Sequence, residues 1–518
     1  MNNYDTLNPM QREAVFTTEG PLLVLAGAGS GKTRALTHRV AYLIEEKGVK
    51  PWNILAITFT NKAAGEMRER VNQLVDFGAD SVWVSTFHSL CVRILRRFIE
   101  NLGYTTDFSI YDSDDTKTLM KQIFKDLEVN QKVLKERGVL GVISSAKNEM
   151  ISPEEFLLSA KADGDSRLQR IGELYMEYQK RLKKNNALDF DDLLVKTVEL
   201  FQAKQEVLEY YQDRFRYIMV DEYQDTNEAQ DLLFTYLSNG HNLFTVGDIK
   251  QSIYRFRLAM PNIFNDKRKR YALYDGKDSN ISSKIILDKN FRSSKGICDY
   301  VNFVFSHLMS EKVGEINYDK QDWLNYGAKY EKNDAVCAQI NIIDKVKGEE
   351  TNKLEALQIA KLIKEKVENK EQIKDGDIYR NIRYSDFAVL FRKMKNIVED
   401  YVEVFTDMAI PVVCDNSSSL FESNEIKIIL SFLRTIDNPT KEISLISTMM
   451  SPIYGFTPDE LAEIRIENKY KNFYFSLSNS KMPKAVAFVN DIKNLKKLSV
   501  TMSVSNFIRY LIEEKGIV

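Results

Sequence analysis

Short apolar runs and longer stretches of helical periodicity alternate along the first half of the chain. The apolar runs predict five strands, at residues 22–25, 54–58, 82–85, 218–220 and 243–246. Helical patterns separate the first three runs, as in parallel sheets whose connecting helices cover the faces. The pattern therefore predicts an α/β domain with a parallel sheet.

Between residues 84 and 218 the strand signal stops and helical periodicity replaces it. An acidic cluster at residues 112–115 has the composition of a helix N-cap and precedes Leu119, Ile123 and Leu127 at helical spacing. We expect helices from about residue 112 to residue 184. We interpret them as a helical domain inserted between two strands of one sheet.

After residue 249 the pattern predicts a second α/β region, with candidate strands at residues 285–287, 340–343 and 387–391. From about Phe421 it becomes helical again and continues so to the end of the sequence. Two α/β regions, each interrupted by helices, are therefore expected.

Length and composition limit the class of protein. A chain of 518 residues is too long for one hydrophobic core, so several domains are expected. Its 44% hydrophobic and 28% charged residues are typical of soluble globular protein. No apolar run approaches the roughly 18 residues that span a bilayer, and the N-terminus lacks the basic and apolar regions of a signal peptide. We expect a cytoplasmic protein without membrane contact.

Charge and cysteine content restrict the chemistry further. The 72 basic residues nearly balance the 74 acidic ones, so nucleic-acid binding has to come from a local track of basic and aromatic groups. A basic run at residues 267–270 is interpreted first as a solvated helix end and second as such a contact. The four cysteines are scattered and include no CxxC pair, which argues against a disulfide framework or a metal cluster.

A glycine-rich segment follows the first apolar run. It consists of Ala26, Gly27, Ala28, Gly29, Ser30, Gly31, Lys32 and Thr33. Glycines in such a turn let backbone N–H groups converge on phosphate oxygens, and the positive end of the following helix points at the same place. Lys32 is expected to reach the β- and γ-phosphates of ATP, and the Thr33 hydroxyl to ligate Mg²⁺. An ordinary strand–turn–helix is the alternative, but it leaves the Lys-Thr pair unexplained.

Two carboxylates, Asp221 and Glu222, follow the apolar run at residues 218–220. In a phosphate-loop ATPase, Asp221 would hold Mg²⁺ and Glu222 would orient and deprotonate the attacking water. Chance acids at an exposed strand end are the alternative, which the phosphate loop upstream disfavours. Arg257 and Arg292 are candidates for contact with the γ-phosphate, because phosphoryl transfer needs fixed positive charge on its transition state.

The ordered set of motifs resembles the UvrD/Rep-type superfamily 1A DNA helicases over essentially the whole chain. The motifs that carry the resemblance are LNPMQ at 7–11, AGAGSGKT at 26–33, FTNKAA at 59–64, TFHS at 86–89, LDFDDL at 188–193 and VDEYQDTN at 220–227. AGAGSGKT is the family's own variant of the phosphate loop, which accounts for Ala26. The resemblance implies RecA-like P-loop NTPase domains.

The resemblance also implies residue roles. Gln11 would read adenine, Phe291 would stack on it, and Arg34 and Arg292 would join the nucleotide pocket. Gln251 would couple the γ-phosphate to the DNA site. The residues implied for single-stranded DNA are Phe59, Asn61, Lys62, Thr86, His88, Tyr254 and Phe256. Core packing is the competing interpretation for the phenylalanines, and a buried hydrogen-bonding role is the competing one for His88.

Two departures from the family pattern stand out. From Val246 onward, GDIKQSIYRFRLA and KNFRSS resemble the AddA branch of helicase–nucleases, and Phe256 replaces the tryptophan usual in UvrD. The family's motif V, with its His-x-x-Lys-Gly-Leu-Glu core, and the arginine-bearing motif VI are not found. We therefore expect the N-terminal two-thirds of a helicase, truncated or a fragment, with poor turnover.

The implied division of the chain follows the family. It comprises domain 1A at residues 1–104 and 188–269, a helical insertion 1B at 105–187, domain 2A at 270–420 and part of a second helical insertion, 2B, at 421–518. The implied function is ATP-dependent 3′-to-5′ translocation on single-stranded DNA with unwinding at duplex junctions, in repair or recombination. The alternatives are the motor of an AddA-like helicase–nuclease and a truncated module that binds ATP and DNA with little turnover.

Overall fold

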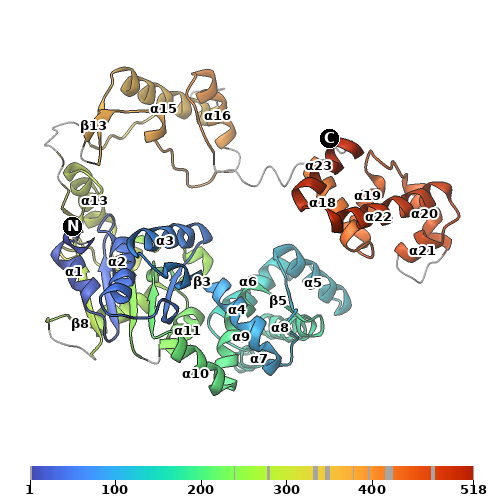
Figure 1. Ribbon diagram of the computed structural model, residues 1–518, viewed down its shortest axis with the longest axis horizontal. Helices are drawn as coiled ribbons and strands as arrows, with labels where there is room; N and C mark the ends of the chain where they lie inside the picture. Colours follow the sequence, from blue (N-terminus) through green and yellow to red (C-terminus); the bar gives the residue numbers. More distant parts are fainter. Residues whose placement is uncertain are drawn as a thin grey trace. The chain divides into compact units, whose positions relative to one another are not determined.

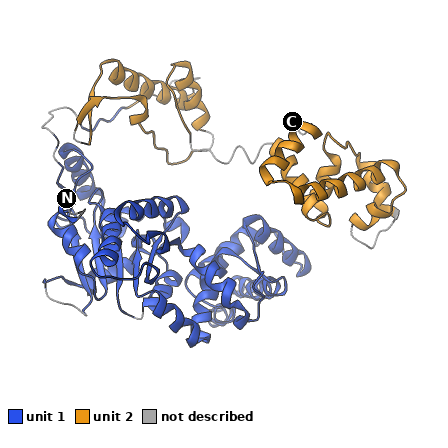
Figure 2. Cartoon of the chain, in the orientation of Figure 1, with its two compact units in different colours: residues 1–341 blue, residues 342–518 orange. Residues whose placement is uncertain are grey.

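The computed structural model describes two compact units, residues 1–341 and residues 342–518 (Figure 2). The described residues are 3–238, 240–276, 281–314, 316–328, 330, 337–344, 350–376, 378–394, 397–414, 424–467 and 473–516. The predicted domain boundary at residues 420 and 421 lies outside them. Among the described helices, none is both long and apolar enough to cross a membrane.

The first unit is built on a seven-stranded parallel sheet with the strand order β3-β2-β6-β7-β1-β9-β8 (Figure 1). The strands are β1 (Leu22–Ala26), β2 (Ile54–Thr58), β3 (Trp83–Thr86), β6 (Tyr217–Val220), β7 (Leu243–Gly247), β8 (Ala272–Leu273) and β9 (Ser283–Leu287). The five strands predicted in the first half of the chain are confirmed. Their near-continuous apolar runs are those of strands buried on both faces.

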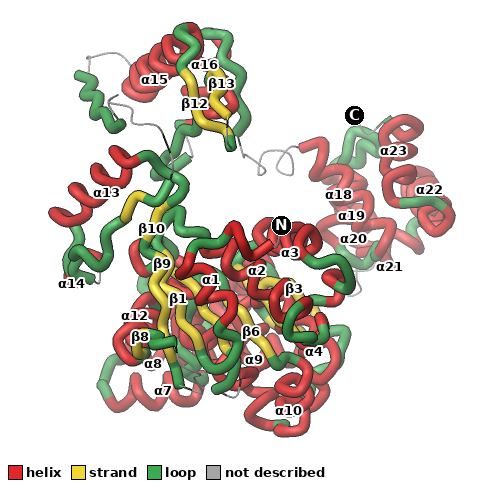
Figure 3. The backbone as a smooth tube through the Cα atoms, turned by 60° about the vertical axis from the view of Figure 1, so that its left-hand side comes forward, coloured by secondary structure: helices red, strands yellow, loops and turns green. Residues whose placement is uncertain are grey.

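Helices cover both faces of the sheet, and each face has its own core (Figure 3). On one face Leu22 and Val24 of β1 join the helices α2 (Lys32–Glu45) and α3 (Asn61–Leu74). On the other face Leu23 joins a second set of helices. That set is α4 (Phe87–Phe98), α9 (Phe190–Ala203), α10 (Gln205–Arg214) and α11 (Glu228–Ser238). The alternation along β1 is the period-2 pattern of a strand.

The predicted helical excursion forms a subdomain with a separate hydrophobic core. Its helices are α5 (Ser113–Asp126), α6 (Glu136–Asn148), α7 (Pro153–Ala162) and α8 (Ser166–Lys184). The short strands β4 (Ser109–Ile110) and β5 (Ala187–Leu188) pair where the chain leaves and re-enters the α/β part. Asp112 is the N-cap of α5 and forms a capping box with Asp115, which confirms the predicted helix start.

The strand predictions after residue 249 are only partly correct. Residues 285–287 do form a strand, β9, but it pairs with β1 and extends the first sheet instead of opening a second one. Residues 340–343 and 387–391 are described and are not strands. Apolar content alone cannot distinguish a strand from an extended segment, because pairing requires a partner strand.

The second unit contains two hydrophobic cores. One lies between α15 (Thr351–Glu368) and α16 (Val398–Asp407), beside the hairpin of β12 (Gln372–Asp375) and β13 (Ile378–Asn381). The other is formed mainly by helices, as the sequence predicts for this region. These helices are α18 (Asn424–Asp437), α19 (Glu442–Met450), α20 (Pro458–Glu467), α21 (Phe473–Asn479), α22 (Pro483–Thr501) and α23 (Val504–Lys515).

The basic run ends helix α12 (Pro261–Arg270), but only its last two residues are exposed. Lys267 is buried, and its Nζ pairs with Oδ1 of Asp231 at 2.6 Å. Arg268 pairs with Oδ2 of Asp322 at 3.1 Å. The interpretation of a solvated helix end is therefore wrong for Lys267, because α12 packs this side chain against Tyr223 and the carboxylate of Asp231 compensates its charge.

A buried ion pair fastens the helical subdomain to α9. Lys147, 1% exposed, lies 2.7 Å from Oδ2 of Asp189 and 2.8 Å from Oδ1 of Asp192. Asp189 also caps α9 by accepting a hydrogen bond from the backbone N–H of Asp192. Tyr178 of α8 donates its hydroxyl to Asp189 at 2.9 Å. Asp189 and Asp192, two of the three aspartates in the LDFDDL segment, are thus structural ion-pair partners of a lysine in α6.

Replacing Lys147 by Ala is expected to lower the free energy of unfolding by about 3–5 kcal/mol, because two buried carboxylates lose their counter-charge. Urea unfolding followed by circular dichroism measures the loss. Lys117→Ala, on the exposed face of α5, is the matched control and is expected to change stability by less than about 0.5 kcal/mol. Equal effects of the two substitutions would contradict the role of the ion pair.

Candidate active site

The glycine-rich segment leaves β1 at Ala26 and enters α2 at Lys32. Gly29 and Gly31 have φ of 67° and 87°, in the left-handed region that glycine adopts without a Cβ clash. A Cβ on Gly31 would lie 2.5 Å from Nε2 of Gln11, so the loop needs glycine for space as well. The buried hydroxyl of Ser30 has no hydrogen-bond partner among the described residues. The loop therefore presents backbone N–H groups, a free hydroxyl and a positive helix end to an anion.

Side chains from three distant parts of the sequence meet at this loop. Nζ of Lys32 lies 2.6 Å from Oε2 of Glu222 and 3.2 Å from Oε1 of Gln251. The hydroxyl of Thr33 lies 3.4 Å from Oδ2 of Asp221. β1, β6 and β7 are neighbours in the sheet, so their carboxyl ends bring these residues together. The structure thus assembles the residues that the sequence suggested for phosphate, magnesium and water.

Asp221 is buried, with 4% of its surface exposed. Burial, and then the negative charge of Glu222, raise the pKa of Asp221 to about 6, against the opposing effect of Lys32. A carboxylate in this position is stabilised by any cation that binds beside it. Carboxylate and hydroxyl oxygens are ligands that Mg²⁺ accepts, so Asp221 and Thr33 fit a magnesium site.

Gln224 holds the carboxylate of Glu222 in place and was not expected from the sequence. Its Nε2 donates to Oε2 of Glu222 at 2.9 Å, and its Oε1 accepts from the backbone N–H of Asp248 at 2.9 Å. Glu222 itself has φ of 50°, a left-handed conformation that turns its side chain toward Lys32. The signal for Gln224 was its place inside the VDEYQDTN motif.

Gln11 and Arg34 lie on the N-terminal side of the loop. Gln11 is buried; its Nε2 donates to the carbonyl of Ser30 at 2.7 Å, and its Oε1 completes the capping box of α1 (Pro9–Phe16). Arg34 donates from Nη2 to the hydroxyl of Thr6 at 2.6 Å. Both side chains therefore border the phosphate loop, as the predicted nucleotide pocket requires.

The segment after β9 is hydrogen-bonded directly to the phosphate loop. Asn290 donates from Nδ2 to the carbonyl of Ala28 at 2.8 Å, and the N–H of Phe291 donates to the carbonyl of Gly29 at 2.9 Å. Oδ1 of Asn290 accepts from the N–H of Arg292 at 2.9 Å. Arg292 was expected to come from a separate α/β region. The pairing of β9 with β1 instead places it in the same unit as the loop, with Asn290 as an anchor that the sequence did not single out.

Arg257 lies away from the Lys32 cluster. Its guanidinium lies 5.2 Å from the ring centroid of Tyr254 and 5.6 Å from that of Phe256. Phe256 is 72% exposed, which disfavours the core interpretation for this residue. The three side chains form an exposed cationic and aromatic surface, which we call the aromatic platform. Its chemistry suits base stacking.

The other predicted DNA residues lie at or near helix starts of the first unit. Asn61 and Lys62 are exposed at the beginning of α3, whereas Thr86 is buried and caps α4 through Ser89. Phe59 is half-buried against Phe87, with ring centroids 4.9 Å apart. Thr86 and Phe59 therefore have clear packing roles.

His88 lies beside the aromatic platform. It lines a cavity of about 230 Å³ with Phe256, Arg257 and Asp191, and burial lowers its pKa. Phe190, 53% exposed, meets the His88 ring edge-on at 5.9 Å and was not singled out from the sequence. The only signal for Phe190 was its position inside the LDFDDL segment.

Comparison with known families covers both halves of the chain. The family model described as the UvrD/REP helicase N-terminal domain matches residues 7–272, and the UvrD-like helicase C-terminal domain matches residues 285–514. The chain belongs to the UvrD/REP helicase family. The phosphate loop, Asp221, Glu222 and Gln251 all fall within the first of these two matches.

Relatives within the family include proteins named ATP-dependent DNA helicase PcrA. The one from Bacillus subtilis (strain 168) is 41% identical over 467 residues, which cover 88% of this chain and 57% of the relative. The one from Staphylococcus epidermidis (strain ATCC 12228) is 37% identical over 98% of this chain and 66% of the relative. The chain thus spans 57% to 66% of the length of these relatives. The wide coverage supports the UvrD/PcrA type after residue 245 as well.

The raised pKa of Asp221 predicts a pH-dependent cost to stability. The pKa of Asp221 rises from 3.8 to about 6 on folding, so ionisation of this carboxyl opposes folding. The resulting loss of stability grows as the pH rises from about 4 to 6 and is constant at higher pH. Asp221→Asn is expected to raise the free energy of unfolding by about 3 kcal/mol at pH 8 and by less at pH 5.

Urea unfolding of this family member at the two pH values tests the cost. Asp213→Asn, at an exposed position, is the matched control and is expected to change neither value. A gain for Asp221→Asn that is the same at pH 5 and pH 8 would show that the ionisation of this carboxyl does not cause it.

Proposed function

We propose that this protein is an ATP-driven DNA helicase that moves 3′-to-5′ along single-stranded DNA and unwinds duplex at junctions, in repair or recombination. The observation that carries the proposal is the meeting of Lys32, Glu222 and Gln251 at the phosphate loop. Family membership and the names of the relatives support it. The residue roles given by the sequence belong to the same proposal, except that Arg257 is assigned to the aromatic platform. The domain boundaries belong to it as well, with the end of domain 1A moved past β9.

The chemistry assigns a task to each residue of the cluster. The loop N–H groups and Lys32 bind the phosphates, and Glu222 accepts a proton from the attacking water while Gln224 keeps its carboxylate oriented. Thr33 and Asp221 would hold Mg²⁺, which neutralises phosphate charge when bound. Phe291 would stack on the base and Arg292 would neutralise phosphate charge, both held at the loop by Asn290.

Gln251 connects the nucleotide to the DNA side. Its Oε1 accepts from Lys32, and its Nε2 donates to Oδ2 of Asp248 at 2.8 Å. The segment that carries Gln251 continues into Tyr254 and Phe256, so a shift of Gln251 on hydrolysis would move the aromatic platform. Bases stacked on that platform would then be passed along, without sequence preference.

Steady-state ATP hydrolysis with and without single-stranded DNA tests the catalytic part. Glu222→Gln is expected to lower kcat at least about 100-fold with little change in ATP affinity, because it removes the proton acceptor only. Lys32→Ala is expected to abolish ATP binding, and Lys117→Ala is the charge-matched control without effect. ATP binding by the unaltered chain without DNA-stimulated turnover would contradict the motor function and favour a module that only binds its ligands.

Single-stranded DNA affinity tests the aromatic platform. Phe256→Ala is expected to weaken binding of an oligonucleotide of mixed sequence about tenfold, in line with the loss of one stacked base. Phe77→Ala, which removes another highly exposed phenylalanine from the same unit, is the matched control. Fluorescence anisotropy with a labelled oligonucleotide measures both. Equal affinities of the two variants would show that Phe256 does not belong to the DNA site.

A further inference from the structure

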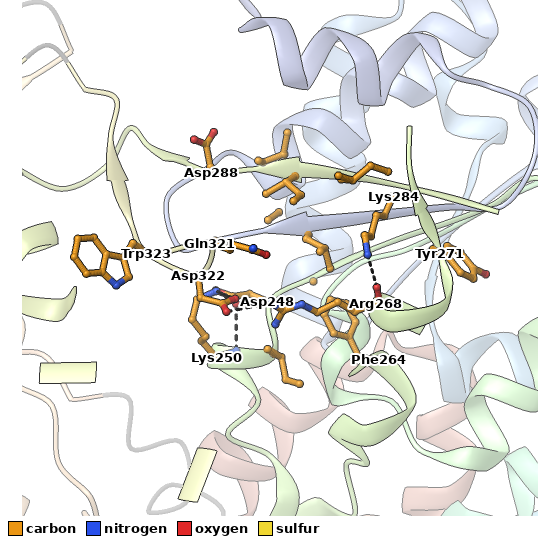
Figure 4. Close-up of a pocket in the computed structure, with 18 of the residues that line it drawn as sticks. Asp248, Lys250, Phe264, Arg268, Tyr271, Lys284, Asp288, Gln321, Asp322 and Trp323 are labelled. Atoms are coloured by element: carbon orange, nitrogen blue, oxygen red, sulfur yellow. Dashed lines mark hydrogen bonds and ion pairs between the residues drawn. The ribbon is translucent and has the colours of Figure 1, made fainter. Parts of the chain in front are cut away.

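A second cavity lies beside the phosphate loop, on the face of the sheet that α12 covers. It has a volume of about 360 Å³ and is bounded by β1, β9, α12 and residues 321–323 (Figure 4). This volume is within the range of small-molecule sites, which is roughly 300–1,000 Å³. None of the nucleotide or DNA roles proposed above uses this space.

The walls of the cavity combine apolar and charged side chains. Along β9, Ile285 is buried in the core of the sheet while Lys284 and Ile286 line the cavity, and Leu287 at the strand end contacts both. Phe264 of α12 adds flat aromatic surface, whereas the ring of Trp323 points away from the other lining side chains (Figure 4). The apolar part of the wall favours a ligand with a flat apolar body.

The cations on the walls differ in how they are paired. Lys250 lies 2.8 Å from Oδ1 of Asp248, and Arg268 pairs with Asp322. Lys284 donates to the backbone carbonyl of Arg268 at 2.6 Å, and no carboxylate in the described part of the chain is within ion-pair distance of it. Figure 4 shows Lys284 of β9 directed at α12 across the cavity.

The environment of Lys284 is unfavourable for its charge. Burial, and then the nearby Arg268, lower the pKa of Lys284. An anionic group placed between these two side chains would relieve both effects and accept charge-assisted hydrogen bonds. The polar end of the cavity is therefore complementary to a carboxylate or sulfonate.

The cavity also contacts the proposed nucleotide site directly. Ala26 and Gly27 of the phosphate loop line it, and so does Asp248. Asp248 accepts from Gln251, which in turn accepts from Lys32, so two hydrogen bonds separate the cavity wall from the phosphate-binding lysine. A negative charge held here would lie beside the phosphate loop and repel phosphates bound there.

We propose that this cavity binds a small aromatic anion, such as an aromatic carboxylate, and that its occupancy weakens ATP binding at the phosphate loop. The binding step stands on the cavity alone. The coupling step rests on the proposed function, since it requires nucleotide at the loop. By linkage, ATP weakens binding of the aromatic anion by the same factor.

Anilinonaphthalene sulfonate, a fluorescent aromatic anion, is the probe. The unaltered chain is expected to bind it, and Lys284→Gln is expected to weaken that binding about tenfold. Lys284→Arg keeps the charge and restores binding, which excludes misfolding as the cause. Ile286→Trp fills the cavity, so the number of probe molecules bound per chain is expected to fall by one. Lys269→Gln, at the exposed end of α12, is the matched control without effect.

Calorimetric titration with ATP tests the coupling. Saturating probe is expected to raise the Kd for ATP at least threefold in the unaltered chain and to have no effect in Lys284→Gln. Lys32→Ala should abolish ATP binding yet keep probe binding, which separates failure of the nucleotide site from failure of the cavity. Probe binding that is equal in the unaltered chain, Lys284→Gln and Ile286→Trp would overturn the binding proposal. An unchanged Kd for ATP would overturn the coupling.

Discussion

The parallel pairing of four neighbouring strands, β6, β7, β1 and β9, is the constraint on which the proposed active site depends. Val220 pairs with Thr245, Leu25 with Gly247 and Ala26 with Leu287, so the four strands end at nearly the same level. The residues that follow these four strands therefore meet at one edge of the sheet, as is general for open α/β folds. Lys32, Glu222, Gln251 and Asn290 are therefore neighbours, although 258 positions separate the first from the last.

Buried charged side chains determine the chemical properties of this edge of the sheet. Asp221 is held where burial raises its pKa, and Lys32 is shared between Glu222 and Gln251. The same principle operates at Lys147 in the helical subdomain and at Lys267 in α12, where buried lysines join neighbouring elements through carboxylates. Such pairs give specific orientation, because breaking one leaves an uncompensated charge. Lys284 differs from them, since a backbone carbonyl is its partner, and this difference suggests a ligand.

The arrangement also separates two tasks in space. The residues that surround Lys32 lie at the strand ends, whereas Tyr254, Phe256 and Arg257 form an exposed surface a few residues beyond Gln251. A single short segment after β7 therefore touches the phosphate-binding lysine at one end and carries the aromatic platform at the other. In the function proposed above, this segment would connect hydrolysis with movement along DNA without a long-range rearrangement of the sheet.

The sequence by itself determined the five apolar strands, the helical subdomain with its Asp112 cap, and the residues of the phosphate loop and of motif VDEYQDTN. These features depend on local periodicity and on side-chain chemistry that short spacing reveals. Only the tertiary structure decided that β9 joins the first sheet, that Lys267 is buried, that Arg257 lies with the aromatic platform and that Asn290 anchors the loop. The reason is that each of these depends on which distant element lies alongside. Strand pairing and burial are set by long-range contacts, which no local pattern contains.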